Sequence, residues 1–222
     1  MQRATVAPSD RPVARLFDGP LDVIGDVHGE IGALGALLGH LGYADDGRHP
    51  DGRRAVFVGD LCDRGPDSPA VLDLVMGWVQ AGRAQCVLGN HELNMLLGEP
   101  KHGNGWLFDR NHETGNGEFL HSRAATAERR AAWVGFLERL PLALARDDLR
   151  VVHACWDEAA LTRLQPLLAA GASYRDVHAT LDRKAHALLR ESGIDSRAAR
   201  EVQAYRHAFK DRSAVLPMLP AC

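Results

Sequence analysis

The segment AVFVGDLCDRG, from Ala55 to Gly65, restricts the fold of this chain more than any other part of its sequence. Its apolar beginning predicts a short buried strand that ends at Gly59. Two carboxylates and a guanidinium follow within five residues, from Asp60, Asp63 and Arg64. A buried strand that stops at a glycine and leads into a charged turn is typical of α/β proteins, which place their chemistry at the carboxyl edge of a sheet.

Two other stretches have the same design. The sequence LDVIGDVHGE spans Leu21–Glu30, and AQCVLGNHEL spans Ala84–Leu93. Each is apolar at first and then offers oxygen or imidazole ligands, which are Asp26 and His28 in the first and Asn90, His91 and Glu92 in the second. Apolar residues recur at helical spacing between these strands, in 31–41 and 68–79. This β-α-β-α-β order predicts a doubly wound α/β pattern in which consecutive strands are parallel.

The rest of the chain is predicted to be mainly helical, apart from one hairpin. Apolar segments at 142–145 and 149–152 predict the hairpin, and the second segment leads directly into His153. Helices are expected at 92–97, 127–139, 158–170, 174–190 and 198–209. Residues 1–20 are expected to be a polar, loosely packed lead-in. Residues 21–222 are expected to form a single domain, because a chain of 222 residues can bury one sizeable core.

The composition narrows the class of protein. A hydrophobic fraction of 45% and a charged fraction of 25% are typical of a globular protein rather than a disordered one. The net charge of −3 gives no overall basic field for nucleic acid. The four cysteines form no CxxC pair, so reduced thiols are expected. No signal-peptide core precedes Leu21, and no apolar run approaches the roughly 20 residues of a membrane span, so we expect no membrane contact and a cytoplasmic location.

Metal-binding side chains follow the ends of the predicted strands. They are Asp26, His28, Asp60, Asn90 and His153. Such oxygen and nitrogen donors suit Mn, Fe, Zn and Mg alike. Asp60, on the central turn, is the candidate for a carboxylate that bridges two ions about 3.5–4 Å apart. Between two such ions a water loses a proton near neutral pH and becomes a nucleophile, so this set of donors predicts a hydrolytic site for phosphate esters.

A phosphoesterase also needs an acid for the leaving oxygen and a cation for the phosphate. His91 directly follows Asn90 and is the candidate acid, with Asp63 to orient it. Arg64 is the candidate phosphate ligand, since a guanidinium can bind phosphate through two parallel hydrogen bonds and lysine cannot.

These segments carry a resemblance to a known family. The blocks GDVHG (25–29), GDLCDRG (59–65) and GNHE (89–92) resemble the three signature blocks of the phosphoprotein-phosphatase-like, calcineurin-like metallophosphoesterases. The sequence VVHACWD around His153 resembles a fourth block. This family includes bacterial Ser/Thr phosphatases, diadenosine tetraphosphatases and polynucleotide phosphatases. The resemblance implies an α/β fold in which two mixed β-sheets form a sandwich flanked by helices, with a two-metal centre at the strand ends.

The resemblance also implies a role for each matching side chain. One metal ion would be held by Asp26, His28 and Asp60, and the other by Asp60, Asn90 and His153. His91 and Asp63 would form the acid dyad, and Arg64 would bind phosphate. One feature departs from the family pattern, because no Gly-His pair follows His153 to supply the last ligand of the second ion. The remaining candidates, His178, His186 and His207, lie in helical patterns without a preceding glycine.

Two classes of function stay open at this point. The first is an enzyme that hydrolyses phosphate esters with a metal-bridging hydroxide, using two divalent ions, with manganese expected and iron, zinc and magnesium as alternatives. Its substrate would be a nucleotide, an RNA or DNA end, or a phosphoprotein. The second is a truncated or non-catalytic metal-binding or interaction module, in which the C-terminal part of the fold is incomplete. The sequence does not indicate the oligomeric state.

Two interpretations remain open for the loop at 101–119. Trp106 is expected either to stack on a base or sugar, with Arg110 on a distal phosphate, or to belong to an ordinary solvated loop.

Overall fold

The computed structural model describes residues 12–101, 103–108 and 122–191. The chain divides into two compact units, Met1–Gly171 and Ala172–Cys222. The first unit holds strands β1 (Val13–Arg15), β2 (Leu21–Ile24), β3 (Arg54–Phe57), β4 (Ala84–Cys86), β5 (Ala143–Arg146) and β6 (Leu149–Val152). Its helices are α1 (Ile31–Leu41), α2 (Ser68–Gln80), α3 (Asn90–Leu97), η1 (Gly105–Leu107), α4 (Ala127–Leu137) and α5 (Glu158–Ala169). Helix α6 (Tyr174–Glu191) belongs to the second unit.

The first sheet has the order β2-β3-β4 and is parallel throughout. Val56 in β3 lies opposite Val23 in β2 and Gln85 in β4. Helices α1 and α2 connect these strands, so the predicted β-α-β-α-β order is confirmed. Each strand ends before a glycine turn, and the three turns therefore lie at one edge of the sheet.

The second sheet has the order β1-β5-β6 and is mixed. Strands β5 and β6 form the expected antiparallel hairpin, and β1 runs parallel to β5. Only this second sheet is mixed in the described part of the chain, whereas the family resemblance implied two mixed sheets. The two sheets share a core that contains Leu16, Val56, Val87, Leu144 and Val151.

The expectation of a loosely packed lead-in was wrong for residues 13–16. Val13–Arg15 forms β1, which pairs with β5, and Leu16 is completely buried between the sheets. A three-residue strand has no periodic pattern of its own, and its partner lies far along the chain. Local sequence could therefore not reveal this pairing.

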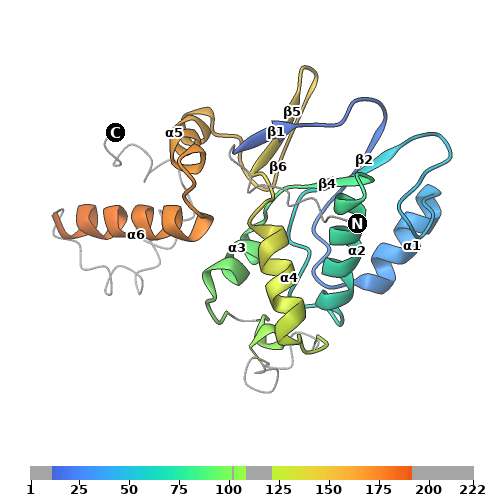
Figure 1. Ribbon diagram of the computed structural model, residues 1–222, viewed down its shortest axis with the longest axis horizontal. Coiled ribbons are helices and arrows are strands. Elements are labelled where there is room, and N and C mark those ends of the chain that lie inside the picture. Colours follow the sequence, from blue (N-terminus) through green and yellow to red (C-terminus); the bar gives the residue numbers. More distant parts are fainter. Residues whose placement is uncertain (1–11, 102, 109–121, 192–222) are drawn as a thin grey trace, which may run out of the picture. The chain divides into compact units, whose positions relative to one another are not determined.

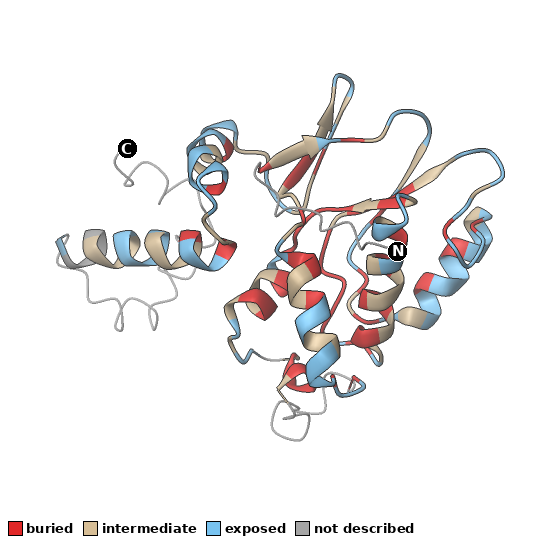
Figure 2. Ribbon diagram, in the orientation of Figure 1, coloured by how far each residue is buried: buried red, intermediate tan, exposed pale blue. Residues whose placement is uncertain are grey.

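Helix α2 packs on β4 and lies between α1 and α4 (Figure 1). Its buried face includes Leu72, Val75 and Trp78, and α4 buries Trp133 and Phe136. Figure 2 colours the buried parts of both helices red. Helix α2 starts with Asp67 as its N-cap, whose carboxylate accepts the N–H of Ala70 at 3.0 Å. These contacts hold the helices against the sheet that carries the candidate site.

The second unit contributes α6, which confirms the helix expected at 174–190. The helix expected at 198–209 lies outside the described residues. The single domain expected for 21–222 stays a prediction. None of the helices described in this structure is both long and apolar enough to cross a membrane.

Candidate active site

Four strand ends supply the candidate site. Asp26 and His28 follow β2, Asp60 follows β3, Asn90 begins α3 after β4, and His153 follows β6. The structure brings together all of the side chains that the sequence indicated, including Asp63, Arg64 and His91. Backbone hydrogen bonds join the first two turns, because the carbonyl oxygen of Asp60 accepts the N–H of Val27 at 3.0 Å and that of His28 at 2.9 Å.

The Asp60 side chain lies at the centre of this cluster and is almost completely buried. Its Oδ1 accepts the backbone N–H of His91 at 3.1 Å and lies 3.4 Å from Nε2 of His153. Its Oδ2 lies 3.9 Å from Nε2 of His28 and 3.8 Å from Nε2 of His91. The Asp60 carboxylate thus faces three imidazole rings.

Two groups of donors could each hold a divalent ion. The first consists of His28, Asp60 and His91, and the second of Asp26, Asp60 and His153. Within each group the ligand atoms lie within 4.8 Å of one another. Asp60 belongs to both groups, which is the arrangement expected of a carboxylate that bridges two ions.

The orientation of His153 supports the fit to a metal ion. Its Nδ1–H donates to the carbonyl oxygen of Val58 at 2.8 Å, which leaves the lone pair of Nε2 facing the site. That nitrogen lies 3.0 Å from Oδ1 of Asn90 and 3.4 Å from Oδ1 of Asp60. Lone pairs that face one another repel, and a bound cation would relieve this repulsion. The residues present therefore fit a divalent ion.

His28 is oriented in the same way. Its Nδ1–H donates to the carbonyl oxygen of Cys62 at 3.2 Å, so that Nε2 points toward the carboxylates of Asp26 and Asp60. A backbone carbonyl behind each ring is the support that metal-binding histidines usually have.

His91 and Asp63 form a buried pair. Nδ1 of His91 lies 2.6 Å from Oδ2 of Asp63. Burial disfavours the charged imidazolium, but the hydrogen bond with Asp63 and the charge of Asp60 outweigh it and raise the pKa of His91 above its ordinary value. A raised pKa keeps a larger share of His91 protonated near neutral pH, as a general acid requires.

The guanidinium of Arg64 lies beside two of these rings. Nη1 donates to Nε2 of His28 at 3.0 Å, and Nη2 lies 3.3 Å from Nε2 of His91. Arg64 thus lies next to both a candidate metal ligand and the candidate acid, where it can reach a phosphate bound between them.

Backbone strain is concentrated at this site. Among the described residues other than glycine, positive φ occurs at His28 (48°), Asp60 (50°), Asp63 (71°) and Arg64 (68°). Each such residue costs on the order of 1–3 kcal/mol and persists only where its surroundings enforce it. All four belong to the set that the sequence indicated, so the strained turns and the candidate chemistry coincide.

The glycines of the signature blocks allow the turns to approach closely. A Cβ on Gly59 would lie 2.5 Å from the backbone nitrogen of Gly89, and a Cβ on Gly65 would collide with the carbonyl oxygen of His28. Gly59 also has φ of +93°, which side chains rarely allow. A side chain at Gly59 would separate the turns after β3 and β4, and a side chain at Gly65 would separate the turns after β2 and β3.

Glu92 supports the turn of Asp60, a role that the sequence did not indicate. Its side chain is completely buried, and its oxygens accept the backbone N–H of Asp60 at 2.7 Å, of Leu61 at 2.8 Å and of Gly89 at 3.1 Å. Burial and the nearby charge of Asp60 raise the pKa of Glu92, against the lowering effect of its hydrogen bonds. Glu92 therefore fixes the strained turn that presents Asp60. Its position directly after His91 was the available signal.

Trp106 is buried, so both expectations for its side chain, stacking on a base or sugar and lying in a solvated loop, were wrong. Its side chain is only 1% exposed, and its Nε1–H donates to Oδ1 of Asp63 at 2.7 Å. Helix η1 turns the ring inward, which the glycine-rich sequence around it did not indicate. Arg110 lies outside the described residues, as does the rest of the loop at 101–119 apart from 101 and 103–108.

The last expected ligand is not identified. His178 and His186 belong to α6 in the second unit, and His207 lies outside the described residues. Nδ1 of His186 lies 2.8 Å from the carbonyl oxygen of Asp182, one turn earlier in the same helix.

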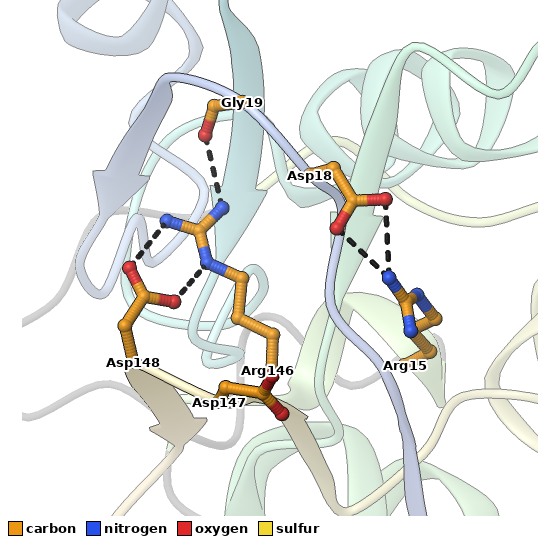
Figure 3. Close-up of a pocket in the computed structure, with 6 residues that line it drawn as sticks. All are labelled: Arg15, Asp18, Gly19, Arg146, Asp147 and Asp148. Atoms are coloured by element: carbon orange, nitrogen blue, oxygen red, sulfur yellow. Dashed lines mark hydrogen bonds and ion pairs between the residues drawn. The ribbon is translucent and has the colours of Figure 1, made fainter.

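A charged cleft of about 330 Å³ lies elsewhere, around the β5–β6 turn (Figure 3). Its arginines are paired within the cleft, Arg15 with Asp18 and Arg146 with Asp148. Arg146 also donates to the carbonyl oxygen of Gly19 at 2.9 Å. His153 follows the opposite end of β6, so this cleft is separate from the candidate active site.

Residues 19–171 match the model of the calcineurin-like phosphoesterases. The chain belongs to this family. Calcineurin-like phosphoesterases use a dinuclear site for divalent metals, in agreement with the two donor groups that share Asp60.

Individual relatives match smaller parts of the chain. It is 36% identical over 138 residues to the asymmetrical bis(5′-nucleosyl)-tetraphosphatase PrpE of Oceanobacillus iheyensis, covering 60% of this chain and 54% of that protein. It is 48% identical over 73 residues to PrpE of Anoxybacillus flavithermus, and this match covers 32% of this chain and 30% of that protein. The chain thus spans about half or less of the length of these relatives.

Among solved structures, a metallophosphoesterase from Sphaerobacter thermophilus is 25% identical with a TM-score of 0.37, covering 59% of this chain and 44% of the other. That likeness is too low to support a conclusion of its own.

Proposed function

We propose that this protein is a metal-dependent phosphoesterase that hydrolyses nucleotide substrates. The observation that carries the proposal is the position of Asp60, which belongs to two metal-binding groups and lies beside the His91–Asp63 pair and Arg64. A protein that only binds a metal would need neither a buried acid pair nor a cation placed for phosphate.

We assign the ligands by the family pattern, in which Asp26 replaces His91 beside His28 and Asp60, and Asn90 replaces Asp26 beside Asp60 and His153. Asp26, His28 and Asp60 would hold one ion, and Asp60, Asn90 and His153 the other. Manganese is the proposed metal, and iron, zinc and magnesium are the alternatives to be tested. When bound, such ions offset the negative charge of the phosphoryl group and make the attacking water more acidic.

The remaining steps depend on side chains of this chain. Arg64 would bind two non-bridging phosphate oxygens and hold the phosphorus in line with the attacking water. As the new P–O bond forms and the old one breaks, Nε2–H of His91 would give its proton to the leaving oxygen. Asp63 would stabilise the imidazolium through Nδ1, where it lies 2.6 Å away.

The names of the relatives support a nucleotide substrate. The two PrpE relatives named above are bis(5′-nucleosyl)-tetraphosphatases. RNA or DNA ends and phosphoproteins are the competing substrates. The described cysteines Cys62, Cys86 and Cys155 are free thiols, which favours a reducing compartment, and we propose the cytoplasm.

The test combines metal analysis with hydrolysis. Manganese-loaded protein is analysed by mass spectrometry for metal content and assayed with diadenosine tetraphosphate, 2′,3′-cyclic nucleotides, phosphopeptides and p-nitrophenyl phosphate. Asp60→Ala serves as the inactive control. We expect two ions per chain and hydrolysis that is fastest with diadenosine tetraphosphate and is abolished in Asp60→Ala. One ion or none, with rates equal to those of Asp60→Ala, would favour a non-catalytic module.

A further inference from the structure

The carboxylate of Asp63 has a different partner on each oxygen. Oδ2 lies 2.6 Å from Nδ1 of His91, and Oδ1 accepts the indole N–H of Trp106 at 2.7 Å. All three residues are buried, with exposures of 2% for Asp63, 8% for His91 and 1% for Trp106. Water therefore has little access to this chain of hydrogen bonds, and the indole holds the oxygen that the imidazole leaves free.

The chemistry of an indole suits this position. The indole nitrogen only donates hydrogen bonds and neither accepts nor releases a proton at ordinary pH. It can therefore stabilise the ionised carboxylate without competing for the proton that His91 carries. The terminal torsion of an aspartate is broad, so a carboxylate with one partner is free to turn. A second partner on Oδ1 fixes the plane of the carboxylate and, through it, the plane of the imidazole.

Trp106 is itself held in place by its surroundings. Its carbonyl oxygen accepts the N–H of Ala125 at 3.1 Å, and its ring meets that of Trp133 edge to face, with centroids 5.9 Å apart. Trp133 is anchored in turn, because its Nε1–H donates to Oδ1 of Asp73 at 2.6 Å. The α4 helix thus supports Trp106 from the side away from the dyad.

From this arrangement we infer that Trp106 is a positioning residue for general acid catalysis. It acts through Asp63 to set the orientation and tautomer of His91, a role that rests on the proposed phosphoesterase function. The same region offers a matched control. Trp133 is also buried and also donates its indole N–H to an aspartate, but Asp73 is not part of the candidate site.

The first test uses the leaving group. Trp106→Phe and Trp133→Phe are compared in the manganese-loaded full chain with phenyl phosphate, which needs a proton on its leaving oxygen, and with p-nitrophenyl phosphate, which needs it far less. We expect Trp106→Phe to lower kcat for phenyl phosphate about tenfold, with a much smaller effect on p-nitrophenyl phosphate and on KM. Trp133→Phe should affect both substrates equally. An equal loss on both substrates in Trp106→Phe would overturn the inference.

The second test does not depend on activity. In the full chain labelled with ¹⁵N-histidine, two-bond ¹H–¹⁵N spectra report the tautomer of His91. We expect a proton on Nδ1 of His91 in the wild type, altered ¹⁵N shifts of His91 in Trp106→Phe, and unchanged shifts in Trp133→Phe, which keeps an aromatic ring against Trp106. Wild-type shifts of His91 in Trp106→Phe would refute the positioning role, even if the protein hydrolyses phosphate esters. A wild-type protein without hydrolysis would instead refute the proposed function, and the His91 spectra would still decide whether Trp106 sets the imidazole.

If Trp106→Phe does not fold, hydrogen exchange of the indole N–H in the wild-type protein tests the inference instead. The Nε1–H of Trp106 should exchange with D₂O far more slowly than that of Trp156, which donates to Glu158 at the surface. Its proton shift should also move in Asp63→Asn. Rapid exchange of this N–H, or a proton shift that stays the same in Asp63→Asn, would contradict the hydrogen bond on which the inference depends.

Discussion

Oε2 of Glu92 accepts the backbone N–H of Asp60 at 2.7 Å from a completely buried position. The same carboxylate binds the N–H of Leu61 through its other oxygen. A side chain on α3 thereby holds the left-handed backbone on which the shared metal ligand depends. The sequence did not indicate this role for Glu92, yet Glu92 controls the geometry of the residue at the centre of the site.

Glu92→Gln should destabilise the protein and weaken metal binding. An amide has one oxygen instead of two, and its NH₂ group would face backbone donors in a buried site. We expect a loss of about 2–3 kcal/mol in the free energy of unfolding. Urea denaturation measures this loss, and manganese titration measures the accompanying drop in affinity. Glu138→Gln, an exposed change next to α4, is the control and should alter neither quantity. If Glu92→Gln were as stable as the wild type, the turn at Asp60 would keep its conformation without Glu92.

His153→Ala should remove one of two ions. Its Nε2 lies beside Asp60 and Asn90, the other two ligands proposed for the second ion, whereas His28 and Asp26 remain available for the first ion. The manganese content measured after dialysis should therefore fall from two ions per chain to one. His186→Ala, in the second unit, serves as the control and should retain two ions. A loss from His186→Ala equal to that from His153→Ala would identify His186 as a ligand.

Gly59→Ala should be far more harmful than Gly52→Ala. Both glycines have positive φ, of +93° and +70°, so both substitutions strain the backbone. Around Gly52 a Cβ would meet nothing within 4 Å, so that variant isolates the conformational cost of about 1–2 kcal/mol. At Gly59 the added Cβ would also collide with the backbone of Gly89, and we expect a further loss of about 2 kcal/mol or more. Equal unfolding free energies for the two variants would disprove the close approach of the turns.

Asp22 should make stability depend on pH in the acid range. Hydrogen bonding from Arg53, supported by Tyr43 and opposed by burial, lowers the pKa of Asp22 below 3.8. A folded-state pKa below the unfolded value means that the ionised carboxylate stabilises the fold above about pH 4, and that this stability is lost as the pH falls through the lower folded-state pKa.

Asp22→Asn should therefore lower the unfolding free energy near pH 7 by about 1 kcal/mol, a small value because Arg53 is 36% exposed to screening solvent. The difference from wild type should shrink as the pH falls below 3.8. Urea unfolding at several pH values tests this. Asp46→Asn removes an exposed partner of Arg48 and should change stability little at any pH. A constant difference between wild type and Asp22→Asn would exclude ionisation as the cause.

Much of this protein could be predicted from local sequence. The apolar runs before Gly25, Gly59 and Gly89 marked the strand ends, and helical spacing located α1 and α2 closely. The candidate ligands could also be named, because a run of carboxylate, amide and imidazole groups after buried strands has few purely structural explanations. These features are local, since strand, turn and ligand lie within about ten residues of one another.

The tertiary structure alone decided other features. Strand β1 depends on β5, which pairs Val13 with Ala143, and Trp106 lies between Asp63 and the ring of Trp133 in α4. Local sequence fixes which segments are buried and where turns occur, since these depend on neighbouring residues. It does not fix which oxygen of Asp63 meets an indole, or that Glu92 reaches the turn of Asp60. Those contacts join residues distant in the chain, and they exist only once the two sheets and their helices have packed together.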